Sequence, residues 1–302
     1  MRNTFADTML EVGKEDENLV VLVADISHFA LQPFAKACPG RFFNIGILEP
    51  TVVNLSAGLA IAGLNPVIHT ITPFLIERSF EQIKLDFCYQ ELGGTLVSVG
   101  SAFDYSALGC SHHCYDDIAL IKSLPRSEVV YPAMPNEFRL LFKQTYKNGR
   151  LTYFRLPGQQ HGVTIPDEKI VFGKGILVRE GRDITIVAAG PQLKTVMEAV
   201  PLLESKGINA EVLYYPTIKP FDEELLVRSI AKTKKVLVLE EHSRYGGLGD
   251  EVLRAGCNVG GVKFSFISIP DKFQRGYGHY AEHLQALGFT AENILVQSSA
   301  LF

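Results

Sequence analysis

The sequence has no long apolar run and no long basic run, and these two absences exclude several classes of protein. No segment approaches the roughly 20 uninterrupted apolar residues that a membrane-spanning helix needs. The formal net charge is −4 and lysine and arginine form no stripe, which argues against non-specific nucleic-acid binding. Residues 1–19 are amphipathic and acidic, without the apolar centre of a signal peptide, so we expect a cytoplasmic protein.

Cysteine is scarce as well, with five residues in 302, and the odd count argues against a disulfide framework. Two of the cysteines, Cys110 and Cys114, flank His112 and His113 in the segment CSHHC. This spacing lacks the second pair of ligands that a structural zinc site requires. We therefore predict no metal site built by this segment.

Strand-like and helix-like segments alternate along the chain. Continuous apolar strands that alternate with helices are typical of a parallel sheet covered on both faces. In the first half, expected strands lie at 18–25, 41–48, 66–71, 94–100, 127–133 and 151–156, and expected helices lie at 51–63, 74–90, 115–124 and 136–148.

The pattern is interrupted at 157–175, where glycine and proline are frequent and periodicity is weak, as in a linker. A second alternating series follows, with expected strands at 183–190, 210–216, 234–241 and 262–269, and expected helices at about 192–206, 222–232 and 247–256. We predict an α/β protein of two doubly wound domains. They comprise a mostly parallel-sheet domain at 1–160, a linker at 161–174 and a smaller domain at 175–302.

A carboxylate, Glu49, ends the second expected strand and directly precedes Pro50 and a predominantly apolar helix. Open parallel sheets bind ligands at the carboxyl ends of their strands. A carboxylate desolvated at the start of a buried helix is suited to exchanging a proton with a ligand nitrogen. The alternative is that Glu49 only interacts favourably with the helix dipole, and the local pattern does not decide between the two.

Two histidines, His112 and His113, lie on a glycine-containing loop between a strand and a helix, on the same edge of the sheet. Either one alone could cap the helix or face solvent, but the pair favours a site. The segment GGLGDEV (246–252) does not match a phosphate-binding loop and is predicted to open a helix. Hydrolase and kinase signatures are absent.

Several longer segments resemble, in the same order, motifs of the C-terminal half of transketolase, of the kind encoded as a separate subunit. The segments are RFFNIGILEP, TPFLIERSFEQIK, GCSHHCYDDIALIKSLP, YPTIKPFDEE and EEHSRYGGLGDEV. The resemblance runs nearly end to end. It implies a pyrimidine-binding domain followed by a transketolase C-terminal domain, with thiamine diphosphate as the cofactor. The implied reaction transfers a two-carbon ketol unit from a ketose to an aldehyde.

The resemblance also assigns roles to particular residues. Glu49 falls on the family's glutamate that hydrogen-bonds N1′ of the cofactor's aminopyrimidine, and Phe74 falls on the aromatic residue that packs against that ring. His112 falls on the active-site histidine near the reactive carbon, which makes Glu49 and His112 the catalytic candidates. We also expect Arg78 to be a cofactor contact.

One part of the family's site has no counterpart in this sequence. The family anchors the diphosphate through Mg²⁺ with a G-D-G…N motif, whereas Gly249-Asp250 is followed here by Glu251. The resemblance therefore implies a partner, an N-terminal transketolase subunit that carries the diphosphate-binding domain and holds most of the Mg²⁺ contacts. We expect an α₂β₂ heterotetramer that is active only when assembled.

Three residues depart from the family's substrate contacts. Leu108 replaces an aspartate, Gly100 replaces a histidine and Gly158 replaces an arginine that contacts substrate phosphate. These losses predict a non-standard sugar specificity. We expect His112, His113 and His28 to contact the substrate. Two alternatives stay open. One is the β subunit of a 2-oxo acid dehydrogenase or a deoxyxylulose-synthase-like acyl transferase, and the other is a non-catalytic assembly subunit.

Overall fold

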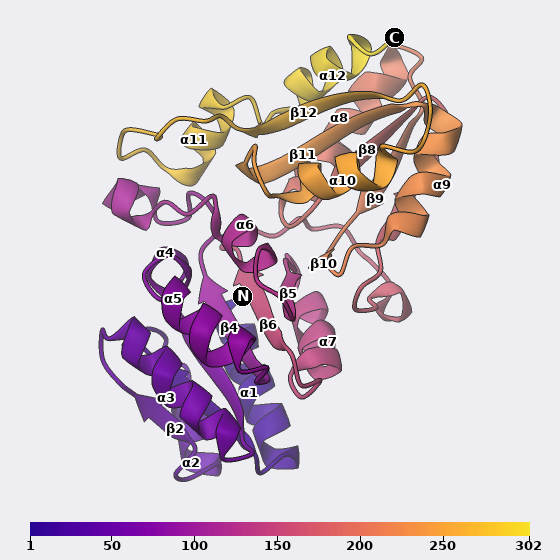
Figure 1. Cartoon of the computed structure of the whole chain (residues 1–302). Coiled ribbons are helices and arrows are strands. Elements are labelled where there is room, and N and C mark those ends of the chain that lie inside the picture. Colours follow the sequence, from indigo (N-terminus) through magenta and orange to yellow (C-terminus); the bar gives the residue numbers. More distant parts are fainter.

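The computed structural model describes residues 1–302 and contains two sheets with helices packed around them (Figure 1). The first sheet has seven strands in the order β10-β5-β6-β4-β3-β1-β2, and the second has five in the order β12-β11-β8-β9-β7. Neighbouring strands are parallel except for β10 against β5 and β7 against β9. The prediction of an α/β protein with two mostly parallel sheets, the second smaller, is confirmed.

The chain forms twelve strands and twelve α-helices. The first sheet contains β1 (Leu19–Val23), β2 (Phe42–Asn44), β3 (Asn65–Ile71), β4 (Gly94–Val99), β5 (Ser127–Val130), β6 (Leu151–Leu156) and β10 (Thr217–Lys219). The second contains β7 (Ile176–Arg179), β8 (Ile184–Ala188), β9 (Ala210–Tyr214), β11 (Lys235–Ser243) and β12 (Lys263–Ile269). The helices are α1 (Arg2–Glu15), α2 (Gln32–Ala37), α3 (Glu49–Ile61), α4 (Thr72–Ile76), α5 (Phe80–Gln82), α6 (Asp117–Lys122), α7 (Pro135–Thr145), α8 (Gln192–Ser205), α9 (Glu223–Thr233), α10 (Leu248–Gly256), α11 (Tyr280–Ala286) and α12 (Ala291–Ser299).

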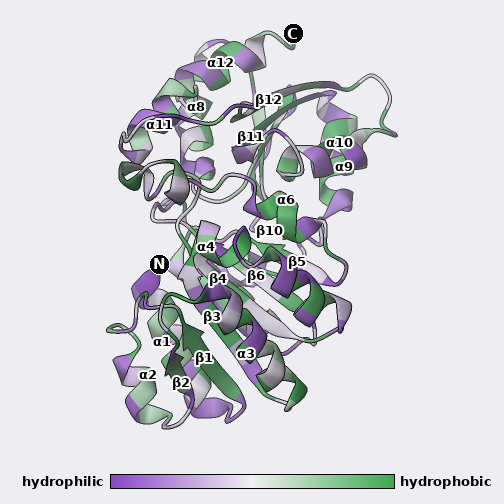
Figure 2. Ribbon diagram, turned by 60° about the vertical axis from the view of Figure 1, so that its left-hand side comes forward, coloured by the Kyte–Doolittle hydropathy of each residue, from purple (hydrophilic) through white to green (hydrophobic).

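The central strands of the first sheet, such as β1, β4 and β6, are buried on both faces. Successive residues of a strand point to opposite faces, so each of these strands contributes to two cores. In β1, Val21 packs with Phe5 of α1 and Phe138 of α7 in one hydrophobic core. Its neighbour Leu22 packs with Val52 of α3 in a second core on the other face. All five residues of β1 are buried, and the strand is coloured as hydrophobic in Figure 2.

Several expected elements differ in length from those observed. The strand expected at 41–48 is only β2, because Gly46 adopts a positive φ of 79° and turns the chain. The helix expected at 74–90 is divided into α4, α5 and a π-helical segment, η1 (Ile83–Tyr89). The turn predicted to open a helix at GGLGDEV is confirmed, since α10 begins at Leu248. No helix in the structure combines the length and the apolar character that a membrane crossing requires.

The two sheets are connected by more than the chain between 157 and 175. Strand β10 comes from the second half of the sequence but pairs with β5 of the first sheet. On β11, Glu241 accepts a hydrogen bond from the N–H of Ala102 (2.9 Å), and its carbonyl oxygen accepts one from Arg155 of β6 (3.1 Å). The segment 161–174 contains only a short 3₁₀ turn, η4 (Asp167–Lys169). The domain bounds expected from the sequence stay a prediction.

A buried carboxyl group makes the stability of the second domain depend on pH. Glu240 on β11 is 4% exposed and accepts a hydrogen bond from the N–H of Gly249 (3.2 Å). Burial raises the pKa of Glu240 from its ordinary 4.5 to about 7. Between these two values the native state holds a proton that the unfolded chain releases. The contribution of Glu240 to stability therefore falls as the pH rises from 4.5 to 7.

Replacing Glu240 with glutamine should remove this dependence. At pH 8 we expect Glu240→Gln to be more stable than the unsubstituted protein, with a free energy of unfolding about 2–3 kcal/mol higher. The reason is that the amide carries no charge to bury. Near pH 4.5 the two proteins should be equally stable. Urea unfolding at both pH values measures the difference. The exposed residue Glu198, changed to glutamine, is the control. A difference for Glu240→Gln that does not change with pH would contradict the prediction.

Candidate active site

Glu49 lies at the first position of α3 and is 2% exposed. Pro50 takes the second position, where its missing N–H costs no intrahelical hydrogen bond because the first amides of a helix have no partner within it. The loop after β2 thus delivers a carboxylate to the carboxyl edge of the first sheet. The carboxylate is buried at the start of a helix whose buried face is formed by Val52, Val53 and Ala57.

Arg78 connects Glu49 with Phe74. Its Nη1 lies 2.7 Å from Oε2 of Glu49, and its guanidinium carbon lies 4.4 Å from the centre of the Phe74 ring. The Arg78 side chain is 45% exposed, so this pair contributes little to the free energy of unfolding. Its main effect is on position, since it fixes one oxygen of Glu49 and leaves Oε1 without a hydrogen-bond donor from this chain.

His112 completes this cluster. Its ring meets the Phe74 ring edge to face, with 5.0 Å between the ring centres. Partial burial lowers the pKa of His112, so the imidazole is mainly neutral at pH 7. The Nδ1 atom lies 3.1 Å from Oγ of Ser111, which leaves Nε2 for a ligand. Glu49, Arg78, Phe74 and His112 therefore form one continuous surface, although they come from α3, from α4 and the turn after it, and from the turn η3 (Cys110–His112).

A buried ion pair fixes the loop that carries His112. Nε of Arg155 lies 2.9 Å from Oδ2 of Asp117, and both side chains are completely buried. Arg155 also donates to the carbonyl oxygen of Cys114 (2.9 Å), and the Tyr153 hydroxyl donates to Asp117 (2.6 Å). The loop from His112 to α6 is thereby tied to β6. An arginine within the apolar run LTYFRL is the sequence signal for such a pair, because arginine is rarely buried without a partner.

A cluster that no local sequence pattern indicates lies beside Arg78. The side chains of Glu77, Cys114 and Asp116 each offer one atom that could bind a metal ion, and these three atoms all lie within 4.8 Å of one another. Burial and the charge of Asp116 raise the pKa of Glu77 to about 7, and burial raises the pKa of the Cys114 thiol. At neutral pH the Glu77 carboxyl group is therefore partly protonated, and the Cys114 thiol is protonated.

Two other candidate histidines lie apart from the cluster that contains Glu49, Phe74 and His112. His113 is 4% exposed, and its ring packs against Phe103 and against His283 of the second domain, at centre distances of 5.2 and 5.3 Å. His28 follows β1 and packs on Phe29 (4.0 Å). Neither ring contacts Glu49 or Phe74. Their assignment as substrate contacts stays a prediction.

Comparison with known families gives two matches that together cover most of the chain. Residues 1–162 match the family described as "Transketolase, pyrimidine binding domain". Residues 173–294 match "Transketolase, C-terminal domain". The class of protein that fold and cluster define is therefore a pyrimidine-binding domain joined to a transketolase C-terminal domain.

Individual relatives agree with this class. The chain is 34% identical over 278 residues to a subunit of the apulose-4-phosphate transketolase of Phocaeicola vulgatus, covering 90% of this chain and 88% of the relative. It is 32% identical to the 6-deoxy-6-sulfo-D-fructose transketolase subunit SqwH of Clostridium sp., covering 94% and 92%. A 1-deoxy-D-xylulose-5-phosphate synthase of Heliobacterium modesticaldum is 34% identical over 96% of this chain, which spans only 45% of that enzyme's length.

A solved structure described as "Split gene transketolase, inactive beta4 tetramer" superimposes with a TM-score of 0.90 and 32% identity, covering 99% of this chain and 97% of that one. This chain belongs to the transketolase family, and it is the counterpart of the C-terminal subunits of split transketolases in that family. Transketolases depend on thiamine diphosphate. The family predicted from the sequence motifs is confirmed.

The cluster of Glu49, Arg78, Phe74 and His112 fits the aminopyrimidine part of thiamine diphosphate. Oε1 of Glu49 is a free acceptor in a buried position, and the half-buried Phe74 offers an aromatic face beside it. His112 adds a neutral imidazole whose ring meets that of Phe74 edge to face. The chain has no G-D-G…N motif to bind the diphosphate and Mg²⁺.

Proposed function

We propose that this chain is the pyrimidine-binding subunit of a two-chain enzyme that transfers a two-carbon ketol unit from a ketose to an aldehyde. One observation carries the proposal. Glu49 is almost fully buried at the carboxyl edge of the first sheet, one of its oxygens is held by Arg78, and the other has no donor from the chain. A carboxylate in this state is suited to exchange a proton with a ring nitrogen placed against it.

Each residue of the cluster would have a separate role in the reaction. Glu49 holds or releases a proton at N1′ of the aminopyrimidine, and Phe74 packs against that ring. Arg78 keeps the carboxylate in position. His112, being neutral, donates a hydrogen bond to the substrate oxygen that gains negative charge. Thiamine diphosphate, when bound, supplies the electron sink that cleavage of the carbon–carbon bond requires.

The other half of the site would come from a partner, an N-terminal transketolase subunit with the diphosphate-binding domain and most of the Mg²⁺ contacts, in an α₂β₂ assembly. The β subunits of the split transketolase of similar fold form a tetramer described as inactive, which supports a partner requirement here. The relatives named for apulose 4-phosphate and a sulfofructose support a sugar substrate outside the common pentulose phosphates.

Cofactor binding should therefore depend on the partner. We expect the chain alone to bind thiamine diphosphate and Mg²⁺ at least about a hundredfold more weakly than the co-expressed pair, because an apolar pocket cannot replace the hydration of a diphosphate. Isothermal titration of both samples measures this ratio, and a screen of ketose donors with the pair tests ketol transfer. Tight binding and turnover by the chain alone would contradict a two-chain site.

An acyl transferase that uses pyruvate is the second candidate, because the synthase of Heliobacterium modesticaldum is as similar in sequence as the relative from the apulose-4-phosphate transketolase. The same co-expressed pair separates the two functions. Decarboxylation of pyruvate in the absence of any ketose would favour the acyl transferase, whereas transfer from a ketose without release of carbon dioxide would favour the transketolase reaction.

A further inference from the structure

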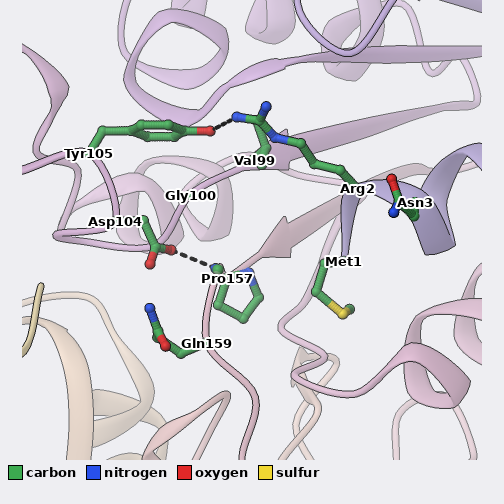
Figure 3. Close-up of a pocket in the computed structure, with 10 residues that line it drawn as sticks. Met1, Arg2, Asn3, Val99, Gly100, Asp104, Tyr105, Pro157 and Gln159 are labelled. Atoms are coloured by element: carbon green, nitrogen blue, oxygen red, sulfur yellow. Dashed lines mark hydrogen bonds between the residues drawn. The ribbon is translucent and has the colours of Figure 1, made fainter. Parts of the chain in front are cut away.

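A pocket of about 420 Å³ opens at the carboxyl ends of β4 and β6 (Figure 3). Arg2, Asp104, Tyr105 and Gln159 contribute its polar side chains, together with Asn3. It adjoins the cluster described above, since the Tyr105 ring centre lies 6.5 Å from that of His112. A substrate held by His112 would therefore extend its far end toward this pocket.

Two glycines leave room for the side chains that define the pocket. A Cβ atom on Gly100, whose φ is +98°, would lie 2.7 Å from the Tyr105 ring. A Cβ atom on Gly158 would lie 2.8 Å from Oδ1 of Asp104. Tyr105 and Asp104 thus occupy the space that larger residues at 100 and 158 would need. The histidine and arginine that the family resemblance leads one to expect at these positions would not fit beside them.

The Asp104 carboxylate is fixed by one of its two oxygens. Oδ2 accepts hydrogen bonds from the N–H of Ser101 (2.6 Å), the hydroxyl of Ser101 (2.9 Å) and the N–H of Gly158 (2.8 Å). Oδ1 receives no hydrogen bond from the chain. Asp104 therefore presents a free acceptor to the pocket in a position set by the loop backbone.

The opposite side of the pocket is closed by α1. Arg2 donates a hydrogen bond to the Tyr105 hydroxyl, as the dashed line in Figure 3 marks. Arg2 is the only lysine or arginine lining the pocket, and Met1, which also lines it, adds an α-amino group whose pKa burial and the charge of Arg2 lower. Asp104 sets a negative charge against these groups. A phosphate monoester carries nearly two negative charges at pH 7 and would meet a carboxylate here. A hydroxyl group, in contrast, can donate to Asp104 and accept from Arg2.

We propose that this pocket holds the unphosphorylated, hydroxyl-bearing end of an aldose acceptor, and that Asp104 determines this specificity. The proposal rests on the proposed ketol transfer and names its class of acceptor. A carboxylate that accepts a substrate hydroxyl gains a charge-assisted hydrogen bond, while the same carboxylate repels a phosphate.

Competition between two acceptors in the co-expressed pair tests the proposal. Ribose and ribose 5-phosphate are supplied together with one ketose donor, and the ratio of the two products gives the ratio of kcat/KM. We expect ribose to be preferred by about tenfold or more, and Asp104→Asn to reduce this preference by about tenfold, because the amide removes the charge and turns the free acceptor into a donor. Glu198→Gln, at an exposed carboxylate outside the pocket, is the control and should keep the original ratio. A preference for ribose 5-phosphate, or an unchanged ratio in Asp104→Asn, would overturn the proposal.

A binding measurement keeps the pocket testable even if no sugar is transferred. The amide NMR signals of Gly100 and Gly158 in the full chain are followed during titration with xylitol and, separately, with inorganic phosphate. We expect xylitol to shift both signals and phosphate to leave them unchanged. Gly158→Ala should abolish the shift of Gly100 by xylitol, because the new methyl group lies against Oδ1 of Asp104. Shifts caused by phosphate but not by xylitol would refute the pocket assignment, whereas absence of transfer with an intact xylitol response would refute only the proposed reaction.

Discussion

Replacing Glu49 with glutamine is expected to lower turnover of the assembled enzyme by a factor of about 10² to 10⁴. The amide keeps the size of the side chain and can still accept a hydrogen bond from Arg78, which lies 2.7 Å from Oε2 in the unsubstituted protein. It cannot exchange a proton at N1′ of the cofactor. Steady-state turnover with the best ketose donor measures the loss.

Two comparisons make the Glu49 result specific. Unfolding of Glu49→Gln should occur at a urea concentration close to that of the unsubstituted protein, since a half-exposed ion pair contributes about 1 kcal/mol or less. Glu17→Gln, at an exposed carboxylate of the same chain, should retain full turnover. Turnover of Glu49→Gln within a factor of about three of the unsubstituted enzyme would remove Glu49 from the mechanism.

The second large effect concerns stability. Replacing Asp117 with alanine is expected to lower the free energy of unfolding by about 3–5 kcal/mol, because it leaves the guanidinium of Arg155 buried without its counter-charge. Both side chains are completely buried, and Arg155 bonds to the backbone of Cys114 and of Glu241 in the other domain. Urea unfolding measures the loss, and the same variant should disturb the His112 loop.

A double variant distinguishes the loss of the ion pair from the loss of side-chain volume. Asp117→Leu combined with Arg155→Met removes both charges, and it should recover most of the stability that Asp117→Ala loses. Lys194→Met breaks an exposed pair, Lys194 with Glu198, and should change the free energy of unfolding by less than about 1 kcal/mol. If Asp117→Ala costs no more than Lys194→Met, the buried pair does not hold the loop as described.

The alternation of strands and helices could be predicted because each buried strand is a continuous apolar run, as in LVVLV of β1. Elements that depend on distant partners could not. Strand β10 has three residues and exists because its backbone pairs with β5, far away in the sequence. Helix α1 is visible in the sequence only as an amphipathic segment, and its packing through Phe5 and Met9 appears only in the folded chain. The break between α4 and η1 has no proline or glycine to signal it.

The candidate site shows the same division. Glu49, Phe74 and His112 follow strands of one parallel sheet, so their meeting at one edge follows from topology once the elements are placed. The contact between Arg2 and Tyr105 joins the first helix to a loop about a hundred residues later, which no local pattern indicates. From the sequence one can say only that Gly100 and Gly158 lack the substrate-contacting side chains of the family. The structure shows which side chains fill their place.

The exchange of the C2 hydrogen of thiamine diphosphate in the co-expressed pair tests the central claim most directly. The claim is that the buried carboxylate of Glu49 activates the cofactor through its aminopyrimidine ring. Quenched NMR samples give the rate of deuterium exchange for the unsubstituted enzyme and for Glu49→Gln, each saturated with cofactor. The account predicts exchange at least about a hundredfold slower in Glu49→Gln, in line with the loss of a general acid–base group. Equal exchange rates in the two proteins would contradict it.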